Sequence, residues 1–179
     1  LAPPQHGLGD LDALVAEVRA AGQEVELVRE RPGGTADDDV AAVVARTAYR
    51  VVQEGLTNAR KHAPGERVVV RLAGDRRAGL TVEVTNRVVR RVSGTDGSAV
   101  DSAVESAVGS TVDSAVDGPA VGAAGAGVGL VGLGERVRLV GGRLEHGVLG
   151  GDAARAPHGA HGPDGAPTFT VRAWLPWQP

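Results

Sequence analysis

The fold of this 179-residue chain is best predicted from one stretch, Ala48-Tyr-Arg-Val-Val-Gln-Glu-Gly-Leu-Thr-Asn-Ala-Arg-Lys-His62. At 3.6 residues per turn it forms the second half of a predicted helix that begins near Asp37. One face of that helix starts apolar and becomes polar toward its end; it carries Val40, Val44, Thr47, Ala48, Val51, Glu54, Asn58, Lys61 and His62. An inward polar group costs free energy unless it has a partner. The polar end of this face is therefore expected to meet other buried polar groups or to line a site.

Glu54 and Asn58 are the most informative pair on this face, because they are four residues apart. At that spacing both side-chain oxygens can converge on one cation or on its bound water. The alternative is an ordinary amphipathic helix whose polar residues gather near a frayed end. The spacing by itself leaves both interpretations open.

A glycine-rich segment, Gly125-Ala-Gly-Val-Gly-Leu-Val-Gly-Leu-Gly-Glu-Arg-Val137, is the second stretch with chemical content. It predicts a helix over 129–140 that ends at a Gly141 C-cap, with apolar positions at Leu130, Leu133, Val137 and Val140. The N-terminus of a helix offers unpaired N–H groups and a partial positive charge, and glycines let a phosphate approach that backbone. The segment therefore indicates a phosphate site, unless its glycines serve only tight helix–sheet packing.

The remaining pattern predicts further helices and strands along the chain. Helical spacing over 11–18 ends at Gly22, and the long helix is expected to be capped by Thr35 or Asp37 and stopped at Ala63-Pro-Gly65. Alternating apolar positions predict strands over 25–29, 67–72, 80–85, 143–146 and 168–175. The second and third of these strands are predicted to form an antiparallel hairpin with one face on the core.

Three segments are predicted to stand apart from this core: a connector over 1–9, a low-complexity insertion over 92–126 and a Gly/Pro/Ala-rich loop over 147–167. The insertion repeats Ser-Ala-Val-Asp and contains five acidic residues and no Lys or Arg. Its charge of −5 is part of a net charge of −3, so the rest of the chain has a net charge of +2. A metal-binding acidic loop is the alternative, but its acids lack a cation-binding turn pattern. His158 and His161 are interpreted as surface residues of the other loop.

Composition argues against several classes of function. With no cysteine the chain has no disulfide framework or thiolate metal site, which fits a reducing, cytoplasmic compartment. One Tyr, one Phe and two Trp provide few stacking platforms, so nucleic-acid binding is not expected. No apolar run approaches the roughly 20 residues that span a bilayer, so no membrane contact is expected from this segment. Because the sequence starts at Leu1 and contains no Met, we expect a piece of a longer protein.

Two motifs carry a resemblance to a known family. Glu54-xxx-Asn58-xx-Lys61-His62 resembles the N-box of the sensor histidine kinases, in the ATPase superfamily that they share with gyrase, the Hsp90 chaperones and the MutL repair proteins. Within this family, the sequence Gln53-Glu-Gly-Leu-Thr-Asn58 is most similar to the nitrate-sensor-like branch. Gly127-Val-Gly-Leu-Val-Gly-Leu-Gly-Glu-Arg136 resembles their G2 box. The family's G1 box, Asp-x-Gly-x-Gly, is degraded here, and the matching positions are Asn86, Val88 and Arg90.

The resemblance covers the chain from about Leu8 to Pro176 and implies a histidine-kinase-like ATPase domain over 10–179. Its fold would be the Bergerat type of α/β structure, a two-layer sandwich with a mixed sheet, helices packed on one face and a long lid loop. The 92–126 insertion falls where the family has that lid.

The resemblance also implies the site residues and the cofactors, ATP and Mg²⁺. Asn58 would ligate Mg²⁺, and Glu54 would orient metal-bound water or assist proton transfer. Lys61 and His62 would offset the charge of the phosphates, and Asn86 would face the adenine. The phosphates would be held by the backbone around Gly127, Gly129, Leu130 and Gly132. Because Asn86 replaces a carboxylate, its hydrogen bond to the adenine would be weaker.

The implied function is the ATP-binding catalytic domain of a two-component sensor histidine kinase, which donates the γ-phosphate to a His on a separate domain. That dimerising phosphoacceptor domain is expected upstream, and a response regulator would take the phosphate next. Alone, the chain is expected to bind ATP without autophosphorylating. Two alternatives are a degenerate interaction module that no longer binds nucleotide and an anti-sigma-factor serine kinase of the same fold. The sequences of the two motifs argue against the serine kinase.

Overall fold

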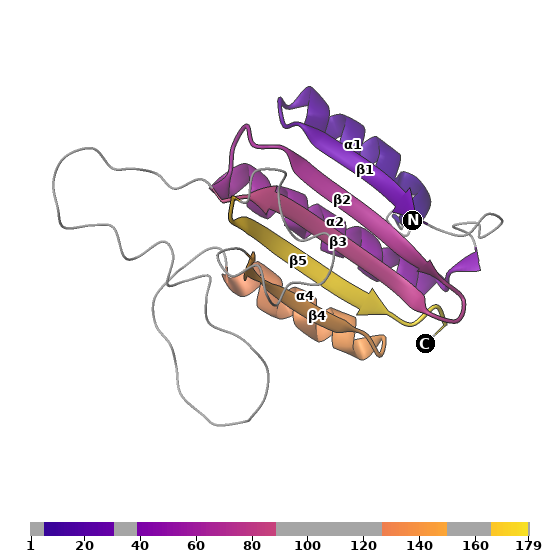
Figure 1. Cartoon of the computed structure of the whole chain (residues 1–179). Helices are drawn as coiled ribbons and strands as arrows, with labels where there is room; N and C mark the ends of the chain where they lie inside the picture. Colours follow the sequence, from indigo (N-terminus) through magenta and orange to yellow (C-terminus); the bar gives the residue numbers. More distant parts are fainter. Residues whose placement is uncertain (1–5, 31–38, 89–126, 150–165, 179) are drawn as a thin grey trace, which may run out of the picture.

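A computed structural model describes residues 6–30, 39–88, 127–149 and 166–178 (Figure 1). The elements in chain order are η1 (Leu8–Asp10), α1 (Leu11–Ala20), β1 (Val25–Glu30), α2 (Ala42–His62), β2 (Val68–Asp75), β3 (Gly79–Arg87), α4 (Gly127–Leu139), β4 (Arg143–Leu149) and β5 (Thr168–Leu175). The proposed caps Thr35 and Asp37 and the 92–126 insertion lie outside the described residues.

The strands form a five-stranded mixed sheet in the order β1-β2-β3-β5-β4. β1 and β2 are parallel, and the other neighbouring pairs are antiparallel. Figure 1 shows α1, α2 and α4 together in one layer behind the sheet. The predicted two-layer α/β sandwich with a mixed sheet and helices on one face is confirmed.

The core lies between the sheet and the helix layer, because the strands alternate as predicted. The buried strand side chains include Val68, Val70, Leu72, Leu80, Val82, Val84, Val171, Ala173 and Leu175. α2 lies over the middle of the sheet and contributes Val44, Ala48, Val51, Val52 and Leu56 to the same cluster. Burying each large aliphatic side chain stabilises the fold by about 1.5–3 kcal/mol. This cluster fixes the position of α2, which carries the residues of interest.

Two helices end in the way that their glycines predict. Gly141 has φ 78°, and its N–H donates to the Arg138 carbonyl while the Gly142 N–H donates to Val137. Gly22 has φ 92° and makes the equivalent pair of bonds after α1. Both arrangements are Schellman motifs, which satisfy carbonyls that a helix end leaves unpaired.

The long helix begins at Ala42, so the prediction that it begins near Asp37 is wrong. The backbone before it is tied to the C-terminal segment instead. The Ala41 N–H donates to the Trp177 carbonyl at 3.2 Å, and the Trp177 indole N–H donates to the Asp39 carbonyl at 2.9 Å. These tertiary bonds replace the expected first turns of the helix.

Two predicted segment boundaries also shift. The end of the predicted 1–9 connector belongs to the core, because Leu8 is only 2% exposed and packs in the hydrophobic cluster. His6, just before it, stacks on Tyr49 with ring centroids 4.9 Å apart. β4 runs to Leu149, so the loop predicted over 147–167 starts later, and residues 150–165 lie outside the described part of the chain.

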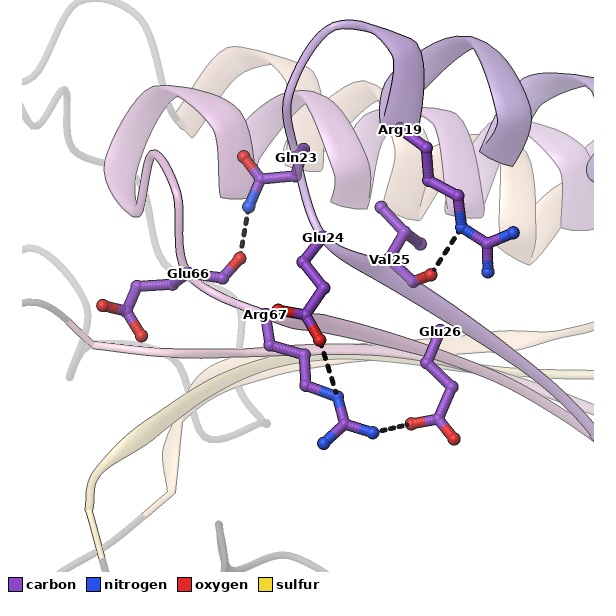
Figure 2. A network of polar contacts seen from close by, with 7 residues as sticks. All are labelled: Arg19, Gln23, Glu24, Val25, Glu26, Glu66 and Arg67. Carbon is purple, nitrogen blue, oxygen red and sulfur yellow. Dashed lines mark hydrogen bonds and ion pairs between the residues drawn. The ribbon is translucent and has the colours of Figure 1, made fainter.

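Polar contacts fasten the first helix and strand to the edge of the sheet (Figure 2). The Gln23 side-chain amide donates to the Glu66 carbonyl, and the Arg19 Nε donates to the Val25 carbonyl at 2.8 Å. Arg67 lies between Glu24 and Glu26, at 3.7 and 2.6 Å. Exposed ion pairs of this kind stabilise by about 0–1 kcal/mol each, so they add register more than stability.

Candidate functional site

The predicted site residues come together at one end of the sheet because α2 and β3 run in the same direction. α2 begins beside the residues that follow β5, where Ala41 bonds to Trp177. That end of β5 pairs with the start of β3, since Leu175 is opposite Leu80. The C-terminal half of α2 and the C-terminal end of β3 therefore share the opposite end of the sheet. Asn58 and Asn86 lie there on different elements.

The glycine-rich helix α4 begins at the same end. A Cβ atom built on Gly129 would overlap the Glu54 carboxylate, which places that carboxylate directly against the first turn of α4. The other end of α4 lies far from Glu54, because a Cβ on Gly142 would meet the Trp174 carbonyl at 2.6 Å. Glycine at position 129 is therefore what allows the two sequence motifs to meet.

Asn58 is the most unusual residue of the site. Its side chain is 3% exposed, and neither its Oδ1 nor its Nδ2 has a hydrogen-bond partner in the described part of the protein. A buried polar group left unpaired costs about 1–3 kcal/mol. A fold that retains this cost at the junction of α2 with β3 and α4 has a polar position ready for a ligand. The carboxamide oxygen is a hard ligand of the kind that Mg²⁺ prefers.

Gly55 positions α2 against β3, a role that the two sequence motifs did not predict. A Cβ at Gly55 would lie 2.8 Å from the Val84 Cβ, so only glycine lets α2 approach β3 this closely. That approach sets the depth of Asn58, which lies one turn further along the helix. A signal was present in the sequence, since a glycine inside a long helix costs roughly 1 kcal/mol relative to alanine and needs a packing reason.

Lys61 and His62 are exposed, so their predicted place on the inward stripe is wrong. The buried positions around the end of α2 are Ala59 and the C-cap residue Ala63, each 1% exposed, and the two basic side chains lie outside that contact. They still belong to a basic end of the helix together with Arg60. Cations at a helix C-terminus are stabilised by the helix dipole, and long side chains there can reach an anion by moving.

Asn86 is buried at 6% exposure, and its Nδ2 donates to the Arg87 carbonyl at 2.9 Å. This bond leaves the Oδ1 atom as the acceptor that remains for another group. Val88 stands at the first lost glycine position, and its N–H donates to the Pro167 carbonyl at 2.8 Å. β3 ends at Arg87, and this backbone bond ties the next residue to the segment before β5. Arg90 lies outside the described residues.

The predicted phosphate-binding backbone belongs to the first turns of α4. Within the described residues α4 begins at Gly127, two residues before the predicted start at 129. The first four N–H groups of a helix have no partner within the helix. Leu130 is 6% exposed and anchors this turn in the core. At Gly132 a Cβ would meet no described atom within 4 Å, so packing does not require glycine there.

In the described ranges, no group of three or more His, Asp or Glu side chains could hold a metal ion. No helix in the same ranges is long and apolar enough to cross a membrane.

No protein-family model and no curated protein matches the sequence. Solved structures do match it. The blue-light activated histidine kinase EL346 of Erythrobacter litoralis superimposes with a TM-score of 0.51 at 17% identity, over 97% of this chain and 47% of that chain. The mycobacterial sensor histidine kinase MprB gives 0.47 at 21% identity, over 96% and 95%. Full-length ShkA in complex with AMPPNP gives 0.46 at 16% identity, over 93% and 30%.

The chain therefore has the fold of a histidine kinase domain, as its motifs predict, and it spans 47% of the length of EL346. The nitrate-sensor-like branch stays a prediction.

Proposed function

We propose that this chain is the ATP-binding catalytic domain of a two-component sensor histidine kinase. It would take the γ-phosphate of Mg·ATP and pass it to a His on a separate dimerising domain, from which a response regulator receives it. The observation that carries the proposal is Asn58, whose two polar atoms are buried without partners beside Glu54 and the start of α4.

The residues at this end of the sheet fit a magnesium–nucleotide complex. Asn58 would supply one oxygen ligand, while the phosphates and water supply the others. When bound, Mg²⁺ neutralises developing charge on the phosphates, and catalysis is then mostly positioning. Glu54 lies against α4, where Gly129 leaves room for its carboxylate. It would accept a hydrogen bond from metal-bound water or assist a proton transfer.

The phosphates and the base would contact different elements. The first N–H groups of α4 would donate to the phosphates, and Lys61 and His62 would supply positive charge from the last turn of α2. Asn86 would accept a hydrogen bond from the adenine amino group through Oδ1, because its Nδ2 is already bonded to Arg87. A neutral acceptor makes a weaker bond than the usual carboxylate, so modest affinity for the base is expected.

Calorimetric titration with Mg·ATP tests the proposal, with wild type compared to Asn58→Ala and with a second titration of ATP in excess EDTA. Binding is expected for wild type, with a loss of about tenfold or more in Asn58→Ala and a smaller difference between the two proteins in EDTA. Equal affinity of both proteins for Mg·ATP would contradict the role of Asn58. No heat at high protein concentration would favour the degenerate interaction module.

Phosphoryl transfer needs a separate assay because the acceptor is proposed to lie on another domain. The chain alone is expected to remain unlabelled with γ-labelled ATP and to label an added histidine-kinase dimerisation domain on an acid-labile site. Acid-stable labelling of a serine would instead favour the serine kinase alternative, because phosphoserine survives acid and phosphohistidine does not.

A further inference from the structure

β4 forms one edge of the sheet, because the strand order ends with β5-β4. Its backbone pairs with β5 on one side, and no described strand pairs with its other side. Figure 1 shows β4 at the edge opposite β1, with α4 behind it. The free side of an edge strand presents N–H and C=O groups that can pair with a strand of another chain.

The opposite edge of the sheet, formed by β1, is protected by side chains of α1. The Arg19 Nε donates to the Val25 carbonyl at 2.8 Å, and Arg29 pairs with Asp12 at 2.9 Å (Figure 2 shows the first contact). Such contacts obstruct the addition of a strand. The described residues place no comparable side-chain bond on the backbone of β4. β4 is therefore the edge that is open to a partner.

A row of charged residues crosses the sheet and ends at β4. Its members lie opposite one another on neighbouring strands and alternate in sign; they are Arg71, Glu83, Arg172 and Glu145. Arg172 lies 3.8 Å from Glu83 within this row. Because opposite charges stabilise a cross-strand pair, the next strand should carry a cation opposite Glu145.

A second copy of β4 supplies that cation. When two β4 strands pair antiparallel around Leu144, Arg143 of each copy lies opposite Glu145 of the other. Centring the pair on Arg143 or on Glu145 instead would place two like charges opposite each other, which destabilises the pair. Arg143 and Glu145 are both exposed, so they are accessible for this contact.

α4 presents a matching surface beside the same edge. A Cβ on Gly134 would lie 3.8 Å from the Leu144 Cδ2, so a twofold axis through Leu144 passes α4 near Gly134. Val131, which is 65% exposed, and Arg138 lie roughly 60° and 40° from Gly134 around the helix. Along the helix they lie roughly 4.5 and 6 Å on either side of it. The axis therefore brings Val131 of one copy to the level of Arg138 of the other, whose aliphatic stem can cover it.

We propose that the chain forms a homodimer in which β4 pairs antiparallel with β4 of a second copy around Leu144. The two sheets join into one, Arg143 and Glu145 form two reciprocal ion pairs, and Val131 packs against Arg138 of the second copy. The strand pair is short and the interface small, so a weak dimer is expected, with a Kd on the order of 100 µM.

The dimer does not depend on the proposed kinase activity. Gly129, which meets Glu54, and Gly134, which meets Leu144, lie roughly 140° apart around α4. The flank of α4 that faces the candidate nucleotide site is therefore outside the dimer interface. Association is expected to be the same with and without Mg·ATP.

Sedimentation equilibrium of the chain, from about 10 µM to about 1 mM, measures the association. Arg143→Glu places a carboxylate opposite Glu145 and should raise the Kd about tenfold or more. The double variant Arg143→Glu/Glu145→Arg restores the pair in reverse and should return the Kd to within about threefold of wild type. Circular dichroism confirms that each variant is folded.

Two further variants complete the series. Val131→Lys places a second cation beside Arg138 of the other copy and should raise the Kd about threefold or more. Glu17→Arg reverses an exposed charge on α1, far from β4, and is the matched control, expected to associate as wild type does.

Engineered thiols test the register, because the chain has no cysteine of its own. Arg143→Cys and Glu145→Cys are prepared as separate proteins and oxidised alone and as an equimolar mixture. Residues directly opposite in antiparallel strands have Cα atoms roughly 4.5–5.5 Å apart, within the range of a disulfide. The mixture is expected to form several times more intermolecular disulfide than either protein alone.

Three results would overturn the proposal. One is a chain that remains monomeric at about 1 mM. Another is a double charge variant that associates no more tightly than Arg143→Glu, or single variants that associate as wild type does. The third is cross-linking of Arg143→Cys or Glu145→Cys alone that equals the mixture.

Discussion

The two ends of the sheet differ in how their polar groups are satisfied. At the end that carries the β2–β3 turn, the Asp75 carboxylate accepts the Arg77 and Ala78 N–H groups, and both indole N–H groups have carbonyl acceptors. At the opposite end, Asn58 is buried with neither polar atom paired among the described residues. The polar groups named at the first end are thus paired within the protein, while the opposite end keeps a buried amide that is unpaired among the described residues.

The same helix, α2, contributes to both stability and the candidate site. Its start is anchored by Trp177 and its middle packs on the sheet. These contacts keep the helix folded although its C-terminal half buries an unpaired amide. Variants at each end should therefore separate stability from ligand binding.

Trp177→Ala is expected to have the largest effect on stability, because it removes a side chain that is 4% exposed and its bond to Asp39. The free energy of unfolding should fall by about 3–5 kcal/mol, as for other buried aromatic truncations. Urea denaturation followed by circular dichroism measures it. Trp174→Ala, at a half-buried position, is the control and should cost less. An equal loss in both would contradict the anchoring role of Trp177.

Gly55→Ala should come next, because its Cβ would lie 2.8 Å from Val84. The clash costs about 1–3 kcal/mol, and the gain of roughly 1 kcal/mol in helix propensity offsets part of it. Adding Val84→Ala should relieve the clash, so the double variant is less destabilised than the two single effects predict together. Gly132→Ala, where no described atom lies within 4 Å, should be neutral or stabilising. Additive effects at Gly55 and Val84 would contradict the close approach.

Gly129→Ala should separate binding from folding. The new methyl group displaces the Glu54 carboxylate, which is the end of a flexible side chain, so stability should change by less than about 1 kcal/mol. Affinity for Mg·ATP is expected to fall about tenfold, since Glu54 and the start of α4 no longer meet. Calorimetry and thermal denaturation of the same protein give both values. Unchanged affinity would remove Glu54 and Gly129 from the site.

Asp75→Ala is expected to have the smallest effect, and that effect depends on pH. Hydrogen bonds from the Ala78 and Arg77 N–H groups lower the pKa of the Asp75 carboxyl below its usual 3.8. A carboxyl whose pKa is lowered by folding adds stability above its unfolded pKa and loses it as pH falls through the folded value. The melting temperature of the variant should therefore be slightly below wild type at pH 7. The difference should begin to shrink only below about pH 4 and should vanish below the folded pKa of Asp75. A constant difference at all pH values would contradict this cause.

Local patterns in the sequence predict most of the fold. β5 occupies 168–175 as predicted, the hairpin of β2 and β3 forms, and Gly141 ends α4. Each depends on alternation or on turn chemistry between near neighbours. The start of α2 was mispredicted because its determinant, Trp177, is distant in sequence.

For the candidate site, the sequence proposes the members but not how they are arranged. The motifs identify Glu54, Asn58 and the glycine-rich helix, and the structure brings them together at one end of the sheet. Burial of Asn58 and exposure of Lys61 depend on how α2 docks, and Gly55 sets that docking through Val84. The contact between Gly55 and Val84 cannot be predicted from helical periodicity alone.

Asn58→Leu tests the central claim most directly, because leucine has a similar size and no polar atom to leave unpaired. Chemical denaturation is measured for wild type and variant, each with and without Mg·ATP. The unfolding free energy of the variant without ligand should rise by about 1–2 kcal/mol, since the cost of burying an unpaired amide is removed. Mg·ATP should stabilise wild type and leave the variant unchanged. A variant that is less stable than wild type and still equally stabilised by Mg·ATP would contradict the claim that Asn58 is kept for its ligand.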